Sequence, residues 1–187
     1  MLIVAGLGNP GTQYRGNRHN VGFMVADLLA ERAKAGPFKE KFSGAFIKTE
    51  LAGREAVLLK PMTYMNLSGE SVQKAMAFFK TSREQLVVVH DELDLPFGTV
   101  RVKSGGGAAG HNGIKSLIQH VGPEFLRVRV GIGRPRSGAV EGYVLSDFDS
   151  MERAELPDVV VRAAKAVETI AAKGAAAAMN EANTREK

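Results

Sequence analysis

The chain of 187 residues contains no cysteine. This absence excludes disulfides, thiolate metal sites and a cysteine nucleophile, and it is typical of proteins from a reducing compartment. No apolar run is long enough to cross a bilayer, and the N-terminus lacks the basic segment and long apolar core of a secretory signal peptide. These absences predict a cytoplasmic protein with no membrane partner.

Several chemical motifs are missing as well. The pattern G-x-S-x-G, which presents a nucleophilic serine on a tight turn, does not occur. The glycine-rich segment 104–113 lacks the Gly-Lys-Ser/Thr ending of a P-loop, which disfavours nucleotide hydrolysis. His90 and His120 do not have the spacing of metal ligands. A hydrolase built from this chain is therefore expected to activate water directly, through a histidine.

Positive charge is concentrated in one stretch of the chain. The whole sequence has a net charge of +5, whereas residues 101–136 contain seven basic residues and only Glu124 as an acidic one. Such a basic, glycine-rich segment is typical of a protein that binds a polyanion, although a solvated basic surface gives the same pattern. Charge alone leaves both interpretations open.

Hydrophobic periodicity predicts strands that alternate with helices, which is typical of an α/β domain. A hairpin around Gly53 makes the expected sheet mixed, so we predict a single domain over residues 1–187, with a twisted mixed β-sheet and helices on both faces. The polar tail 180–187 is expected to fray. The predicted strands are 2–6, 46–51, 56–59, 86–89, 99–103 and 125–132, and the predicted helices are 21–34, 71–80, 113–121 and 151–173, the last with a possible extension over 175–179.

The first strand is followed by a glycine loop that matches a nucleotide-cofactor pattern. Gly6, Gly8 and Gly11 satisfy G-x-G-x-x-G, but Pro10 removes a backbone donor and disfavours a helix that starts at the glycine turn. The acidic residues about 20 positions on lie inside the next helix rather than at a strand end. The loop instead carries polar and aromatic side chains suited to a reaction centre: Asn9, Tyr14 and His19.

His19 and Asp91 are the candidate base and its partner. Histidine is the usual general base near neutral pH, and a carboxylate that fixes its tautomer makes it more effective. Asp91 follows the apolar strand 86–89 and is preferred to Glu92 and Asp94 because it comes first after the strand. A structural role for His19 remains an alternative at this point.

Asparagines occupy the loops that follow other strands. Asn9, Asn66 and Asn112 each offer both a donor and an acceptor to a peptide group. Helix capping is the alternative role for such residues, and we favour it for Asn20, while for Asn66 it remains open. His111 precedes Asn112 and a helix, which predicts either a supporting role in the site or a structural role at the helix N-terminus.

Taken together, these motifs resemble the bacterial-type peptidyl-tRNA hydrolase family over nearly the whole chain. They occur in the order typical of that family, which makes the resemblance far more specific than a lone glycine pattern. The matching stretches are 6–11, Tyr14 with 18–22, 60–69, 90–96, 110–113 and 129–133.

The resemblance implies hydrolysis of the ester between a peptide and the 3′ ribose of tRNA, with no metal or organic cofactor and with a monomeric protein. It implies that His19 activates water with Asp91 as its partner, and that Asn9 senses the blocked α-amine. Asn66 and Asn112 would hold the peptide and ester groups, with a supporting role for His111. The expected pocket residues are Tyr14, Tyr64 and Met65, and the expected tRNA phosphate contacts are Arg101, Lys103 and Arg129.

Small departures from the family pattern concern two loops. Asn17 stands where the family usually has threonine, and Ala108 and Ala109 replace glycines of the glycine loop. A non-catalytic RNA-binding domain is the main alternative function, because it too accounts for the basic stretch. A nucleotide-cofactor oxidoreductase is the third possibility, which Pro10 opposes.

Overall fold

The computed structural model describes residues 1–184 and contains one seven-stranded sheet in the order β2-β3-β4-β1-β5-β7-β6. The predicted single α/β domain with a mixed sheet is confirmed. Every strand and helix predicted from the sequence is present, with bounds that agree to within three residues, except that the extension expected over 175–179 is a separate helix that reaches residue 184. The strands are β1 (Leu2–Gly6), β2 (Lys39–Lys41), β3 (Gly44–Leu51), β4 (Arg54–Pro61), β5 (Leu86–Glu92), β6 (Val100–Ser104) and β7 (Leu126–Gly131).

Four neighbouring strands at the centre of the sheet are parallel. β1 pairs with β4 on one side and β5 on the other, and β5 pairs in turn with β7. Both outer parts of the sheet are antiparallel, because β3 pairs with β2 and β4, and β6 pairs with β7. All residues of β1 and β5 are buried, as expected for parallel strands covered on both faces.

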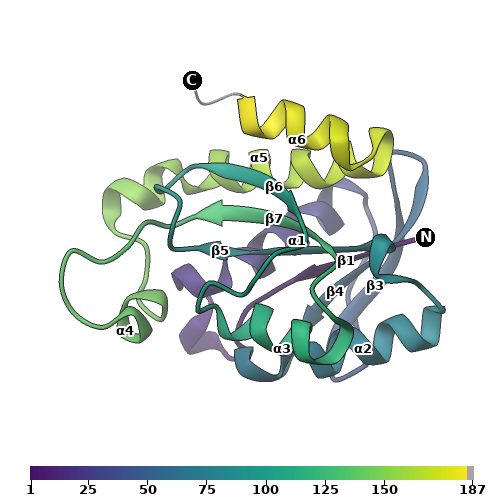
Figure 1. Cartoon of the computed structure of the whole chain (residues 1–187), viewed down its shortest axis with the longest axis horizontal. Coiled ribbons are helices and arrows are strands. Elements are labelled where there is room, and N and C mark those ends of the chain that lie inside the picture. The colour runs from purple at the N-terminus through teal and green to yellow at the C-terminus, as the bar shows by residue number, and fades with distance from the viewer. Residues whose placement is uncertain (185–187) are drawn as a thin grey trace.

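Helices cover both faces of the sheet (Figure 1). α1 and α5 pack on one face, where Val4 and Val87 belong to the core, and α2 and α3 pack on the other, where Ile3 and Val88 do. None of the helices among residues 1–184 has the length and apolar character needed to span a bilayer. The helices are α1 (Val21–Arg32), α2 (Ser68–Phe79), α3 (Asn112–Val121), α4 (Val140–Val144), α5 (Ser150–Lys173) and α6 (Ala175–Thr184).

Two glycines allow α1 to start directly against the sheet. A side chain on Gly6 would collide with the backbone carbonyl of Gly22, and a side chain on Gly22 would collide with the backbone of Leu7 and Val89. The first turn of α1 therefore rests on the ends of β1 and β5. Because His19 lies two residues before α1, this close packing brings it to the end of β5, where Asp91 lies.

The C-terminal segment differs from expectation. Residues 180–184 were expected to fray, but they are the last turn of α6, and 185–187 lie outside the described residues. The side chain of Asn183 accepts from the backbone N–H of Val102 (3.0 Å) and donates to its carbonyl (3.2 Å), as a neighbouring strand would. This tertiary pairing with β6 orders a segment whose composition alone predicts disorder.

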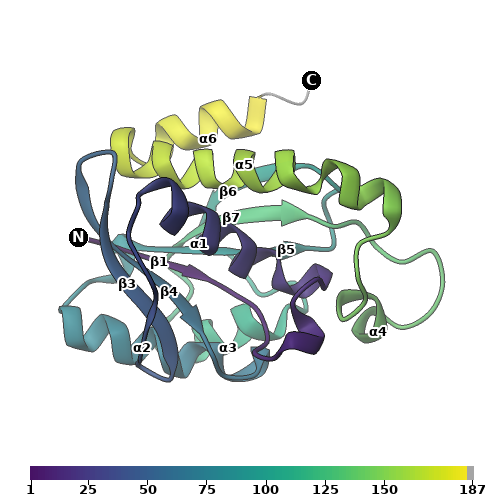
Figure 2. The ribbon, with the colours of Figure 1, turned by 180° about the vertical axis from the view of Figure 1, so that it is seen from behind.

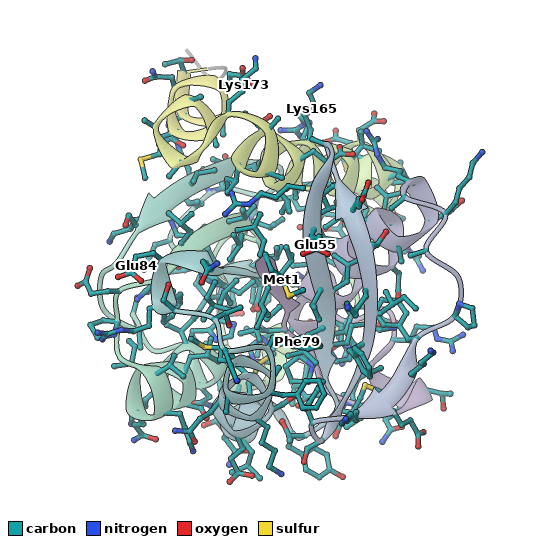
Figure 3. The ribbon with its side chains drawn as sticks, turned by 90° about the vertical axis from the view of Figure 1, so that its right-hand side faces the viewer. Met1, Glu55, Phe79, Glu84, Lys165 and Lys173 are labelled. Carbon is teal, nitrogen blue, oxygen red and sulfur yellow. The ribbon has the colours of Figure 1, made fainter. Side chains whose placement is uncertain are left out.

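The fold places the polar loops at one end of the molecule. Figure 3 looks onto the opposite end, where Met1, Glu55 and Glu84 mark the starts of β1, β4 and β5. The carboxyl ends of these parallel strands, and the loops that follow them, lie at the far side. α4 also lies at that end, beside the segment that follows β1 (Figure 2), although the sequence did not predict it.

Candidate active site

Two histidines share one buried carboxylate at the end of β5. Asp91 accepts a hydrogen bond from His19 Nδ1 at its Oδ2 atom (2.7 Å) and from His111 Nε2 at its Oδ1 atom (2.8 Å). Asp91 is 2% exposed, and the ring centroids of the two histidines are 4.8 Å apart. Residues separated by 72 and 20 positions in the sequence thus form one hydrogen-bonded cluster.

Hydrogen bonding fixes the tautomer of His111. Its Nδ1 accepts from the backbone N–H groups of Gly113 (3.1 Å) and Ile114 (3.2 Å), at the first turn of α3. An Nδ1 that accepts cannot carry a proton, so the proton lies on Nε2 and is donated to Asp91. His111 is therefore both the N-cap of α3 and a donor to Asp91, which joins the two roles that the sequence left open.

His19 uses the opposite ring nitrogen. Its Nδ1–H is directed at Asp91, which leaves Nε2 as the unprotonated nitrogen. None of the described residues hydrogen-bonds this Nε2, and His19 lines two adjoining hollows at the surface. A histidine held in this tautomer, with a free Nε2 facing a cleft, is suited to take a proton from water.

The ionisation of Asp91 is maintained by its two partners. Burial by itself disfavours the charged carboxylate, but the adjacent imidazoles of His111 and His19 outweigh this cost and hold the pKa of Asp91 well below its usual range. Behind them, burial and the neighbouring His111 lower the pKa of His90 to about 3, so this ring is neutral in the folded protein. The cluster therefore contains one fixed negative charge.

His19, Asp91 and His111 are the only group of His, Cys, Asp and Glu side chains among residues 1–184 whose ligand atoms lie close enough together to suggest a metal site. Both ring nitrogens that face Asp91 are engaged with it in hydrogen bonds, and a metal would have to displace their protons. The arrangement is that of an acid–base pair with a supporting ring rather than an open ligand set.

Asn9 is positioned by a pair of hydrogen bonds from Asn20. The Asn20 side chain accepts from the backbone N–H of Asn9 (2.8 Å) and donates to its carbonyl (3.0 Å). Asn9 Oδ1 in turn accepts from the backbone N–H of Met65 (2.7 Å), so its Nδ2 remains as a donor toward the cleft. The N-cap role expected for Asn20 is wrong, because its side chain makes no capping hydrogen bond.

A cleft of about 320 Å³ collects most of the polar residues predicted for the site. Asn66, Asn112 and Tyr64 are exposed at its surface, whereas Met65 is buried beneath it. A second hollow of about 230 Å³, which includes Asp91 and His111, adjoins it at His19. The predicted residues that line the 320 Å³ cleft are Asn9, Tyr14, His19, Tyr64, Met65, Asn66 and Asn112.

Arg18 holds α4 over the cleft, a role that sequence reasoning missed. Its guanidinium donates to Ser146 Oγ (2.5 Å), to the carbonyl of Asp147 (2.8 Å) and to Glu152 Oε1 (2.7 Å). It also lies 4.1 Å from the centre of the Tyr143 ring. These contacts fix the segment that brings Glu141, Val144 and Leu145 to the cleft. Only the adjacency of Arg18 to His19 could have indicated this in the sequence.

Basic side chains line one face of the antiparallel pair β6–β7. Arg101 lies opposite Arg129, and Lys103 lies opposite Arg127. Lys103 is exposed, Arg129 lies 3.7 Å from Glu92, and Arg101 donates to the carbonyl of Asn183 (2.6 Å). Arg127 is buried and donates to the carbonyls of Gly106 and Gly107, so it orders the glycine loop instead of adding to an exposed basic surface.

The fold and the site define a protein of the mixed α/β class, with a hydrogen-bonded histidine–aspartate pair at an open cleft. The family model described as peptidyl-tRNA hydrolase matches residues 3–187. The chain belongs to the peptidyl-tRNA hydrolase family.

Individual relatives agree with this assignment. Curated peptidyl-tRNA hydrolases are 60% identical in Sorangium cellulosum (100% of this chain and 86% of the relative covered) and 46% identical in Bacillus subtilis (99% and 100%). The crystal structure of peptidyl-tRNA hydrolase from Acinetobacter baumannii superimposes with a TM-score of 0.93 at 38% identity, covering 98% of this chain and 95% of that one. The predicted enzyme class is confirmed, and a non-catalytic RNA-binding domain is not favoured.

Proposed function

We propose that this chain hydrolyses the ester between a peptide and the 3′ oxygen of tRNA, with His19 as the general base and Asp91 as its partner. The observation that carries this proposal is the 2.7 Å hydrogen bond from His19 Nδ1 to Asp91, which leaves Nε2 free at the cleft. An ester is already activated relative to an amide, so a base, an oriented water and donors to the developing oxyanion suffice.

The chemical step is a direct attack of water. His19 Nε2 takes a proton from water while the water oxygen bonds to the ester carbonyl carbon. The bond from that carbon to the ribose 3′ oxygen then breaks, and the proton passes from His19 to the leaving oxygen. The products are a tRNA with a free 3′ hydroxyl and a peptide carboxylic acid, which releases the remaining water proton to solvent and becomes a carboxylate. Asp91 stabilises the protonated His19 between these two transfers.

Three amides orient the substrate in this proposal. Asn9 Nδ2 donates to the peptide group that blocks the α-amine, which distinguishes peptidyl-tRNA from aminoacyl-tRNA. Asn66 and Asn112, exposed at the cleft, hold the peptide and ester groups, and His111 supports Asp91. The aromatic and apolar residues of the cleft, Tyr14, Tyr64 and Met65, contact the terminal adenosine and the esterified residue.

The basic face of β6–β7 is the proposed site for tRNA phosphates. Cations directly opposite one another in a ladder repel, as Arg101 and Arg129 must. A bound polyanion relieves that repulsion, and the exposed Lys103 and the partly exposed Arg101 and Arg129 are the proposed contacts for it. Phosphate contacts provide affinity without reading the base sequence, which suits an enzyme that acts on many tRNAs.

The remaining features of this proposal are a cytoplasmic location, a monomeric state and a reaction without metal or organic cofactor. The absence of cysteine suits a reducing compartment, and peptidyl-tRNA is produced where proteins are synthesised. Light scattering of the purified protein tests the monomeric state.

The decisive experiment is the release of free tRNA from N-blocked and unblocked aminoacyl-tRNA. We expect cleavage of the blocked ester and much slower cleavage of the unblocked one, with the preference reduced in Asn9→Ala. Lys103→Glu provides the comparison, because it is expected to weaken both substrates equally. Failure of the wild-type protein to cleave either ester would overturn the proposed function.

A further inference from the structure

A hollow larger than the active-site cleft lies on the other side of Asn9. It measures about 510 Å³, compared with about 320 Å³ for the cleft. The same two segments, residues 9–15 and 60–66, form walls of both, and Asn9 lines both. The hollow is therefore continuous with the cleft along the chain that forms it, and Asn9 marks the boundary between them.

The walls of this hollow are mainly apolar. Phe23 and Met24 from α1 and Met62 from the segment after β4 line it. The ring of Phe23 lies so close to Gly8 that a side chain at that glycine would touch it. The absent side chain of Gly8 thus leaves space for the Phe23 ring at the wall.

The charged groups at its edge are largely engaged with each other. Lys60 Nζ lies 2.6 Å from Asp27 Oδ1 and 4.4 Å from the centre of the Phe38 ring. The positive charge of this lysine is thus paired with a carboxylate of the same hollow. Arg15 is exposed at the rim, where its guanidinium can donate to carbonyl groups of an extended peptide.

The order of the strands separates this hollow from the proposed tRNA surface. The basic face belongs to β6 and β7, whereas Lys60 comes from β4 and the hollow borders α1. His19 and Asp91 lie between them, at the ends of β1 and β5. A substrate whose tRNA lies toward β6 and β7 and whose ester lies at His19 therefore extends its peptide past Asn9, toward the hollow.

We propose that this hollow is the subsite for the residue that precedes the esterified amino acid, and that it favours an apolar side chain there. This inference rests on the proposed function. Asn9 Nδ2, fixed at the boundary by Asn20 and Met65, donates to the peptide carbonyl between the two residues. The preceding side chain then packs among Phe23, Met24 and Met62.

The test compares two N-acetylated dipeptidyl-tRNAs that differ only in the first residue, leucine or glycine. We expect the wild-type protein to have about tenfold higher kcat/KM for the leucine substrate, because the leucine side chain is transferred from water to the apolar walls of the hollow. Met62→Asp is expected to reduce this ratio to about twofold or less, because it places a charge in the apolar wall. Met62 is 43% exposed, so the change is compatible with folding.

A matched control is available on α5. Val161 has a similar exposure of 42% and lies outside the described hollows, so Val161→Asp should leave the ratio at its wild-type value. Equal kcat/KM for the two substrates in the wild type would overturn the subsite. So would an equal loss for both in Met62→Asp, which would indicate that the hollow holds a part common to them, such as the terminal adenosine. If the proposed function itself is wrong, the result is different, because neither ester is then cleaved by the wild-type protein.

Discussion

The dipeptide His-Asn occurs twice in this molecule, each time at the start of a helix, with opposite consequences. His19-Asn20 leads into α1 and His111-Asn112 leads into α3. Both histidines donate to Asp91, but His19 does so through Nδ1 and His111 through Nε2. The nitrogen that remains is free at the cleft in His19, whereas in His111 it caps α3.

The asparagines divide in the opposite direction. Asn20 is 2% exposed, and its side-chain amide is hydrogen-bonded to the backbone of Asn9, whereas Asn112 is exposed at the cleft. One pair therefore provides a histidine with a free ring nitrogen and a structural asparagine, and the other provides a structural histidine with an exposed amide. The lesson is that the hydrogen bond made by the second polar atom, not the residue type, decides which member of each pair can meet a substrate.

The largest expected effect separates the two histidines. His19→Ala removes the proposed general base and should lower kcat by about 10²- to 10⁴-fold in single-turnover hydrolysis of N-acetyl-aminoacyl-tRNA. His111→Ala should lower kcat by about tenfold or less, since Asp91 keeps its bond to His19. It should also destabilise the protein by about 0.5–2 kcal/mol through loss of the cap. Equal losses of kcat in the two variants would contradict the division of roles.

The next effect concerns the buried ring of His90, which lies 5.1 Å from that of His111. Its pKa of about 3 in the folded state lies below the ordinary value of 6.5. At acid pH the unfolded chain therefore binds a proton that the native state does not, and the free energy of unfolding falls as the pH decreases below 6.5. By pH 5 this loss amounts to about 2 kcal/mol, and it becomes negligible about one pH unit above 6.5.

His90→Asn tests this pH dependence. Asparagine retains a donor for the backbone carbonyl of Asp91, which His90 Nδ1 meets at 2.8 Å. Urea unfolding at pH 7 and pH 5 should show a smaller loss of stability for the variant than for the wild type, whatever the offset between them at pH 7. Parallel losses in both proteins would show that His90 does not contribute to the acid sensitivity.

The smallest effect separates the two asparagines. Asn112→Ala should lower kcat/KM by about tenfold, the value of one hydrogen bond of about 1 kcal/mol or slightly more, without changing the melting temperature. Asn20→Ala should lower both kcat/KM and the melting temperature, because it leaves two buried backbone groups of Asn9 without partners. Thermal unfolding and steady-state kinetics on the same preparations check this. A stable Asn20→Ala variant with wild-type activity would contradict the positioning role.

The sequence predicted the sheet and its main helices because their periodicity is local. The strand 86–89 and the hairpin around Gly53 need only short-range apolar patterns and turn residues. A capping box between Ser82 and Gln85 likewise depends only on the spacing of two nearby residues. The short helix α4 was missed, since five residues carry too little periodicity to be recognised.

Contacts between distant segments could not be predicted by such patterns. The bonds from Arg18 to Glu152 join residues 134 positions apart, and nothing near either residue indicates the other. Asn20 has the residue type of an N-cap, but the nearby backbone of Asn9 competes for its amide and is the better partner. Arg127 adds to the charge of its segment in the sequence, yet in the fold its guanidinium is satisfied by carbonyls of the glycine loop.

The pairing of Asn183 with Val102 has a consequence for solubility. A sheet with two free edges can recruit strands from other molecules, and proteins block this in different ways. The edge strand β2 is only three residues long and reads Lys-Glu-Lys, so charge protects it. β6 is longer, and the amide of Asn183 from α6 occupies the backbone N–H and carbonyl of Val102 within it. α6 thus protects this edge of the sheet from pairing with a strand of another molecule.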